Sequence, residues 1–374
     1  MSGSISVAAI QMDAAFTSID DRLRRAEKAV QQAVEAGAKL VVLPRQFATG
    51  YSYDDIQYEL SQTLDDAIVN WMKQQASLHD VHLAGSVLLW DVDEVFNAAL
   101  LVSPDGRLWR YDQQFPFLWE RALFRDGDGI LVAHTELGRI GVMVGWDVAH
   151  PDIWMRYAAN VDLLIVLHSM PDWSHAQIQF ADGVQVVDLS GIAGLVPFAD
   201  VFATYLQQMA IWMDVPVIVA GSSGHLDTLL PLPRLTFLPL SLANTELLAF
   251  LNHAGDGYLH APFIQATGIY SGGSLLTDSA NDGDQVATAT FDLPVQRPMP
   301  QTAQPAAIFP ESLVMAIDAL SAAAYAPVYQ RSQRRQWGAR MAPASTKTRI
   351  WLMTTLFALI MGFVTGLFAK RLQR

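Results

Sequence analysis

The chain has no cysteine in its 374 residues. This absence excludes disulfides, thiolate metal sites and a cysteine nucleophile. Lysine is also scarce, because none occurs between Lys73 and Lys347. Chemistry that needs a lysine ammonium is therefore excluded from that long central stretch.

Basic residues are few and unevenly placed. The chain has 24 Lys and Arg against 37 Asp and Glu, a net charge of −13. Nine basic residues and no acidic ones occur from Arg331 onward, so residues 1–330 carry a net charge of −22. Such an acidic body repels nucleic acid and anionic lipid, whereas the basic tail attracts anionic lipid headgroups. We expect no nucleic-acid partner.

Apolar residues are abundant: 51% of the chain is hydrophobic and 10% is aromatic. A chain of this length and composition can bury a large core, unlike a disordered one. No pattern of metal ligands or cofactor-binding motif stands out. We expect neither a metal site nor a cofactor.

The longest uncharged stretch lies near the C-terminus, where residues 350–369 read IWLMTTLFALIMGFVTGLFA. A helix of this length is about 30 Å long, the thickness of a bilayer's hydrocarbon core. Ten of its residues are Leu, Ile, Val or Phe, and each favours insertion by about 0.3–0.6 kcal/mol. The alternative is a buried C-terminal helix. The flanking basic clusters favour a membrane anchor.

The flanks of this stretch also predict its orientation. Six basic residues lie between Arg331 and Arg349, and three follow the span, which favours a body on the cytoplasmic side. The N-terminus, MSGSISVAAI, lacks the basic and long apolar regions of a secretory signal. Gly362 and Gly366 form a GxxxG pair that would let two such helices approach closely.

The body alternates between apolar runs and helical spacing. Strands are expected at 5–12, 39–44 and 82–90, with helices at 19–37 and 64–79 between them. The second half repeats this order, and a late pair, GGSLLTDS and QVATATFDL, is expected to close the sheet. The pattern predicts an α/β fold with two similar sheet halves and helices outside, a four-layer α-β-β-α sandwich.

Three regions are expected along the chain. Residues 1–300 form the sandwich, 301–349 a C-terminal helix with a basic linker, and 350–369 the transmembrane helix. Residues 225–262 do not fit the alternation of strands and helices, because they are rich in leucine yet contain several prolines that forbid one continuous helix. This insertion is interpreted either as a lid-like loop or as an exposed apolar surface for a membrane or partner. It is too broken to span a membrane.

Many ordered motifs resemble the nitrilase superfamily of carbon–nitrogen hydrolases over residues 5 to about 293. They include AAIQMD, LVVLPRQFATGY, FNAALLVSPDGRLWRYDQQ, GRIGVMVGWDVAHPDIWMR, DLLIVLHSMPDW and VPVIVAGSSG. The resemblance implies an αββα sandwich. It also implies a catalytic triad of a glutamate base, a lysine that stabilises the oxyanion and a cysteine nucleophile.

In this chain all three triad positions are replaced. The glutamate position is Arg45, the lysine position is Gln113 or, by a shift of one residue, Gln114, and the cysteine position is Gly145. A glycine has no nucleophile, and a guanidinium stays protonated and cannot act as a base. We therefore expect a pseudoenzyme without catalytic residues.

A rebuilt site is the alternative to inactivity. His150, Asp147, Asp152, Ser169 and His168 lie close to the former cysteine strand or the strand after it. These residues offer the parts of a Ser/His/Asp relay, although Asp147 and Asp152 match positions that shape the site in the family. A broad hydrolase assay with Ser169→Ala as control would detect such chemistry.

The resemblance also places a second family glutamate at Glu120. We expect Arg45 and Glu120 to pair in the vestigial pocket, together with Asp147 and Asp152. An opposite charge at about 4 Å offsets roughly 4 kcal/mol at an effective dielectric near 20. The alternative for Arg45 is to hold a small anionic ligand, as guanidinium groups do.

These expectations define a function. The chain is predicted to be a membrane-anchored, inactive nitrilase-like protein that serves as a scaffold or accessory subunit of a membrane protein complex. Its expected partners are a membrane protein or a second copy, as a homo-oligomer. The alternatives are a sensor of a small anionic metabolite and an enzyme of altered chemistry.

Overall fold

The fold is taken from a computed structural model of the chain. It describes residues 4–15, 17–180, 186–190, 198–241, 244–272, 274–279, 281–293, 298–301 and 303–336. The predicted span 350–369, including Gly362 and Gly366, lies outside these residues, as does the basic linker beyond residue 336.

The first sheet has seven strands in the order β12-β1-β2-β3-β4-β5, with β17 also paired to β1. β1, β2 and β3 run parallel, whereas β4, β5 and β17 join antiparallel to their neighbours. The strands are β1 (Ser4–Asp13), β2 (Leu40–Val42), β3 (His82–Asp91), β4 (Glu94–Val102), β5 (Leu108–Asp112), β12 (Ser222–Ser223) and β17 (Gln285–Asp292).

The second sheet has six strands in the order β16-β15-β11-β8-β7-β6. Its centre, β11-β8-β7, is parallel and buried, which explains the continuous apolar runs such as LLIVL. The strands are β6 (Val132–Thr135), β7 (Gly138–Val144), β8 (Leu163–Leu167), β11 (Val217–Ala220), β15 (Gly268–Ser271) and β16 (Ser274–Asp278).

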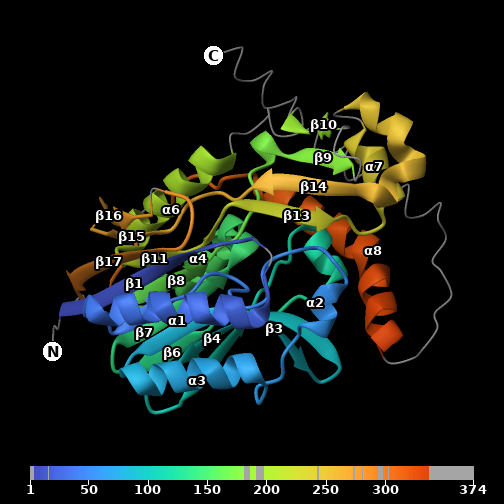
Figure 1. The fold of residues 1–374 in the computed structure, drawn as a ribbon. Helices are drawn as coiled ribbons and strands as arrows, with labels where there is room; N and C mark the ends of the chain where they lie inside the picture. Colours follow the sequence, from blue (N-terminus) through green and yellow to red (C-terminus); the bar gives the residue numbers. More distant parts are fainter. Residues whose placement is uncertain are drawn as a thin grey trace.

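The two sheets pack face to face through apolar side chains such as Val7, Val42, Val142 and Ile165. Helices α1 (Ile19–Glu35) and α3 (Ala67–His79) cover the outer face of the first sheet. Helices α4 (Pro151–Tyr157) and α6 (Phe198–Met213) cover the second (Figure 1). The body is therefore the predicted α-β-β-α sandwich.

The two sheets are joined at one edge. The chain leaves β11 in the second sheet and enters β12 in the first at Gly221, whose carbonyl accepts a hydrogen bond from Met12 N at 3.2 Å. The late pair expected to close one sheet is divided, because β16 extends the second sheet and β17 pairs with β1 in the first. The expectation that the two strands close one sheet together was wrong, since an apolar pattern does not specify which strand a given strand pairs with.

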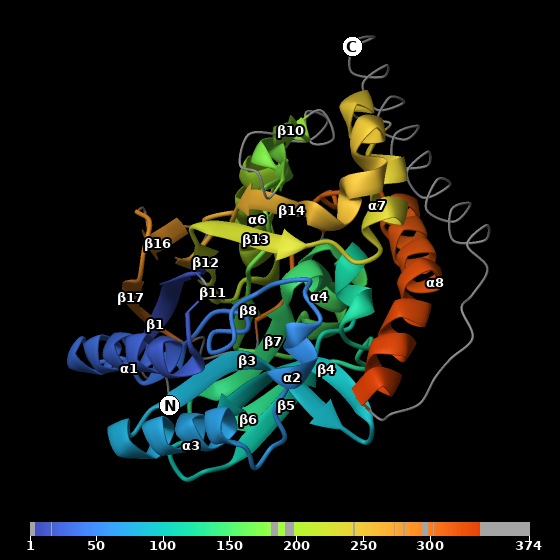
Figure 2. The same cartoon turned by 45° about the vertical axis from the view of Figure 1, so that its right-hand side comes forward.

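The insertion 225–262 is not a loop. It forms strand β13 (His225–Leu229), helix α7 (Pro233–Leu240), the 3₁₀ helix η4 (Thr245–Asp256) and strand β14 (Gly257–Pro262). β13 and β14 pair, and with β9 (Gln177–Phe180) and β10 (Val186–Asp188) they build a third sheet above the sandwich (Figure 2). Alternating burial along β13 and β14 explains the strands, and Pro233 is tolerated as the first residue of α7.

The large apolar side chains of the insertion are for the most part either buried, as are Phe237, Leu247 and Leu259, or partly buried. Leu248 and Tyr258 are exposed exceptions, at 49% and 43%. The insertion is therefore folded onto the body, because its buried side chains belong to the same apolar cluster as those of α4, α6 and α8.

Helix α8 (Glu311–Gln336) runs along the side of the body, where Leu313, Ile317 and Tyr325 are buried. Over Glu311–Arg331 it is long and apolar enough to cross a membrane, but half of that stretch is buried inside the protein. Core helices of soluble domains meet the same criterion. The contacts of α8 with the body mark it as part of the fold. The short elements α2 (Ile56–Glu59), η1 (Leu118–Ala122), η2 (Gly145–Ala149) and η3 (Trp173–His175) complete the described structure.

Candidate functional site

Arg45, Gln113 and Gly145 meet at one end of the sandwich. Arg45 follows β2, Gln113 follows β5 and Gly145 follows β7, each at the carboxyl end of its strand. A Cβ atom built on Gly145 would lie 3.1 Å from Arg45 Nη1 and 3.4 Å from Gln113 Nε2. Three residues distant in sequence thus share one small volume.

Arg45 forms the predicted ion pair with Glu120 of η1. Arg45 Nη1 lies 2.6 Å from Glu120 Oε1, and the two side chains are 0% and 2% exposed. The prediction of the pair is confirmed. A charge pair this deeply buried is stable only if its remaining donors and acceptors are also satisfied.

Glu120 accepts four hydrogen bonds. Its Oε1 accepts one hydrogen bond from Arg45 Nη1 and another, at 2.5 Å, from the hydroxyl of Tyr51. Its Oε2 accepts hydrogen bonds from Gln113 Nε2 at 3.0 Å and from the backbone N–H of Phe117 at 2.8 Å. Each carboxylate oxygen therefore has two donors, which uses the hydrogen-bonding capacity of the group.

The guanidinium of Arg45 is equally well satisfied. Arg45 Nη2 donates to Gln113 Oε1 at 2.8 Å. With its amide oxygen facing the guanidinium, Asn97 accepts from Arg45 Nε at 2.7 Å and donates to Ser86 Oγ at 3.0 Å. The guanidinium carbon also lies 4.8 Å from the ring centre of Tyr51, a cation–π contact.

These contacts fix the protonation of the cluster. Burial opposes the charge on Arg45, but the attraction of Glu120 outweighs it, so the pKa of Arg45 lies above its ordinary value. Burial, with the charge of Glu120, also raises the pKa of the Tyr51 and Tyr53 hydroxyls. Arg45 stays a cation and both tyrosines stay neutral at physiological pH.

Gly145 adopts a left-handed backbone conformation, with φ +55°. Gly145→Ala should destabilise the fold by about 1–3 kcal/mol, because L-residues are strained there and the new methyl group would press on Arg45. Gly272→Ala is the matched control, since Gly272 has φ +56° and open space at its Cβ. Chemical denaturation should show the larger loss for Gly145→Ala; equal losses would mean that contact with Arg45 costs nothing.

Gln113, and not Gln114, turns into the cluster. The side chain of Gln114 instead donates to the Tyr111 hydroxyl at 3.1 Å and accepts from Arg156 Nη1 at 3.2 Å. The alternative placement of the lysine position at Gln114 is thus the poorer fit to the geometry.

Asp147 is fully buried beside the cluster and holds its backbone in place. Its carboxylate accepts from the Tyr111 hydroxyl at 2.7 Å and from the backbone N–H groups of Gln114 and Phe115 at 3.1 and 2.8 Å. Burial raises its pKa to about 7, against the effect of these hydrogen bonds. Asp147 therefore links the segment after β5 to the turn that carries Gly145.

Asp152 does not line the pocket, in contrast to the prediction. It lies exposed in the first turn of α4, whose buried face is formed by Ile153, Trp154 and Tyr157. Helical periodicity turns Asp152 away from that face, and a carboxylate near a helix N-terminus is favourable in water.

Ser169, His168 and His150 do not assemble into a relay. Ser169 Oγ lies 2.8 Å from Ser222 Oγ and also donates to the carbonyl of His168. The Nε2 atom of His168 lies 3.2 Å from the carbonyl of Ile264, and His150 Nε2 lies 3.2 Å from Asp318 on α8. Among the described residues, the Ser169 hydroxyl thus has no imidazole as its hydrogen-bond partner.

Burial lowers the pKa of His168 to about 3, so this imidazole stays neutral in the fold. Between pH 6.5 and pH 3 the unfolded chain binds a proton that the folded chain does not, so stability falls as the pH falls through this range. From pH 6 to pH 4, wild-type stability should drop by about 1.4 kcal/mol per pH unit more than that of His168→Gln. Denaturation at several pH values measures this; parallel profiles would contradict it.

Sequence reasoning missed three members of the cluster: Tyr51, Tyr53 and Asn97. The hydroxyls of Tyr51 and Tyr53 lie 3.0 Å apart, and both rings are buried. The GYSY sequence after Arg45 carried a signal, because a tyrosine close to a buried ion pair offers a hydroxyl donor. Asn97 is on β4, and only the pairing of β4 with β5 brings it beside Gln113.

Comparison with known proteins gives the family. The carbon-nitrogen hydrolase family model matches residues 6–278, more than half of the chain. The chain belongs to this family, within the nitrilase superfamily. The predicted resemblance is confirmed.

Curated relatives agree with this assignment over part of their length. A nitrilase of Pyrococcus abyssi is 29% identical over 152 residues, which cover 40% of this chain and 58% of the relative. Omega-amidase YafV of Escherichia coli K12 is 29% identical over 137 residues, covering 36% and 52%. The matches thus span between half and three fifths of these relatives.

Solved structures share the fold more completely. Saccharomyces cerevisiae Nit3, a member of branch 10 of the nitrilase superfamily, has a TM-score of 0.56 at 17% identity, covering 77% of this chain and 90% of Nit3. An amidase from Nesterenkonia sp. AN1, solved with acrylamide added at its active-site cysteine, has a TM-score of 0.55 at 16% identity, covering 78% and 94%.

Proposed function

We propose that this chain is a catalytically inactive member of the carbon–nitrogen hydrolase family, anchored in a membrane by residues 350–369. Its body, on the cytoplasmic side, serves as a scaffold or accessory subunit of a membrane protein complex. The observation that carries the proposal is the buried Arg45–Glu120 pair, which fills the space in front of Gly145.

The first support is the lack of a nucleophile at the site. The Nesterenkonia amidase has an active-site cysteine, whereas this chain has no cysteine anywhere. Gly145 stands in the turn after β7, and a side chain there would meet Arg45 rather than a free space for a substrate. The site thus has neither the reacting atom nor the volume that acyl transfer needs.

The second support is the lack of a free base. Glu120 is the carboxylate nearest to Arg45, and its two oxygens accept four hydrogen bonds. A carboxylate held in this way cannot accept a proton without breaking the ion pair. Arg45 cannot accept one at all.

The same contacts argue against a sensor of small anions at this site. The Arg45 side chain is 0% exposed, and its donors already bind Glu120, Gln113 and Asn97. An anion would have to displace Glu120 and leave that carboxylate buried without a cation, at a cost of several kcal/mol. The ion pair is therefore interpreted as structural.

The membrane part of the proposal is supported by composition and by the packing of α8. The uncharged stretch 350–369 has the length of a bilayer core, with basic residues on both sides. Helix α8, which precedes it, is held to the body through Asp318, whose carboxylate lies 3.3 Å from Arg121 Nη2. A body rigidly attached to α8 would be held close to the membrane surface.

Purification from native membranes in a mild detergent tests this function. The full-length chain should be recovered in a stoichiometric complex with a membrane protein or with further copies of itself. A variant lacking 350–369 is the control for association after lysis, because it should not carry the membrane partner. Recovery of the full-length chain as a free monomer would contradict the scaffold role.

A further inference from the structure

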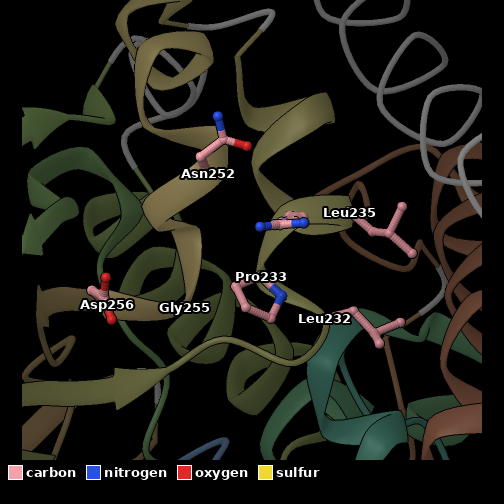
Figure 3. A pocket seen from close by; sticks show the side chains of 7 residues that line it. Leu232, Pro233, Leu235, Asn252, Gly255 and Asp256 are labelled. Atoms are coloured by element: carbon pink, nitrogen blue, oxygen red, sulfur yellow. The ribbon is translucent and has the colours of Figure 1, made fainter.

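We propose that a cleft between α7 and η4 binds a phosphoethanolamine group. This α7–η4 cleft has a volume of about 370 Å³ and lies in the insertion, outside the Arg45 cluster. Figure 3 shows Asn252 and Asp256 on one side and Leu232, Pro233 and Leu235 on the other. The remaining lining residues are Arg234 and Gly255.

The cation of the cleft has no partner among the residues that the structure describes. Arg234 is exposed and makes no hydrogen bond or ion pair with any residue that the structure describes. It is also the only Lys or Arg among the described residues between 157 and 330. A guanidinium left open at the wall of a cleft has its whole fork of donors free for phosphate.

The opposite charge lies in the same cleft but does not neutralise the cation. Asp256 forms no ion pair with Arg234, and its one ionic contact with a described residue is with His253 Nδ1 at 3.8 Å. Two opposite charges that line one cleft without meeting leave a gap that a ligand with separated charges can bridge. A ligand with only a negative charge would be repelled by Asp256.

Other groups complete the match to phosphate and lipid chemistry. Asn252 is exposed, and its amide makes no hydrogen bond with a described residue. Arg234 is the second residue of α7, in the first turn, where the helix dipole favours an anion. Leu232 and Leu235 are only partly buried and provide apolar surface beside the charges.

These features select a phosphate joined by a short spacer to an ammonium group. The phosphate would bind Arg234 and Asn252, and the ammonium would bind Asp256. Two sources carry this chemistry: the headgroup of phosphatidylethanolamine and free O-phosphoethanolamine. The apolar rim favours the lipid, whose glycerol and first acyl carbons would contact the leucines.

The test uses the full-length chain in a nonionic detergent and follows ³¹P NMR signals of two probes. Dihexanoyl phosphatidylethanolamine represents the lipid and O-phosphoethanolamine the free compound. Both should bind saturably, and tighter binding of the lipid probe would identify the membrane as the source. Arg234→Gln should weaken binding by about tenfold or more.

Two further variants keep the result specific. Lys28→Gln removes an exposed charge from α1, far from the cleft in sequence, and should leave the affinity unchanged. Asp256→Asn should weaken binding of both amine probes but strengthen binding of inorganic phosphate, because the repulsion is removed. The proposal is overturned if no probe binds saturably, if Lys28→Gln and Arg234→Gln act equally, or if Asp256→Asn shifts all ligands in one direction.

Discussion

Arg45→Ala should lower the free energy of unfolding by about 3–5 kcal/mol. The substitution leaves Glu120 buried at 2% exposure with its cation removed, while Tyr51, Gln113 and Phe117 still hold it in place. Glu120→Ala should lower the free energy of unfolding by a similar amount, because it leaves the buried guanidinium of Arg45 without its anion. Equilibrium urea unfolding of the full-length chain in nonionic detergent, followed by tryptophan fluorescence, measures both losses.

A double variant separates the ion pair from simple packing. Arg45→Met with Glu120→Leu removes both charges and fills the space with apolar atoms, so much of the lost stability should return. Strict additivity of the matched single substitutions Arg45→Met and Glu120→Leu would show that the charges do not interact. Single-variant losses below about 1 kcal/mol, in the range of surface pairs, would contradict a structural role for the pair.

Deleting residues 350–374 should move the protein from the membrane to the soluble fraction. The ten Leu, Ile, Val and Phe residues of the span favour insertion by about 3–6 kcal/mol in sum. Fractionation of cells with an alkaline carbonate wash compares the two chains, because the wash removes proteins held by charge alone. The full-length chain should resist extraction, and the truncated chain should not.

Two point substitutions show which helix is responsible. Ala358→Arg places a charge near the middle of the predicted span and should cost about 2.5–3.5 kcal/mol of insertion. Met315→Arg changes an exposed residue on α8 and should leave the protein in the membrane fraction, since α8 packs on the body. Release by Met315→Arg but not by Ala358→Arg would assign the anchor to α8 and contradict the proposal.

The sandwich could be predicted because its central strands are buried on both faces. Runs such as LLIVL in β8 and LVV in β2 are apolar at every position, and helices with one apolar face alternate with them. The third sheet was not predicted. Its strands β13 and β14 read HLDTL and GYLHAP, without the continuous apolar runs of the sandwich strands, and the short β9 and β10 become a sheet only through pairing with them.

The site was partly predictable for a chemical reason. A buried arginine needs an anion, so Glu120 could be expected from charge alone once both residues were assigned to one pocket. The places of Asn97 and Asp152 around this pair could not be predicted. Asn97 reaches Arg45 because of the register between β4 and β5, and Asp152 points to solvent because of the rotation of α4 about its axis. Both depend on tertiary geometry that a linear pattern does not contain.

The most direct measurement of the central claim is turnover by the purified full-length chain on a broad panel of amides, nitriles and esters. Inactivity predicts rates equal to the background of the buffer, unchanged in Ser169→Ala and in Arg45→Ala. Turnover that saturates with substrate and disappears in Ser169→Ala would contradict it, because it would show that Ser169 acts as a nucleophile.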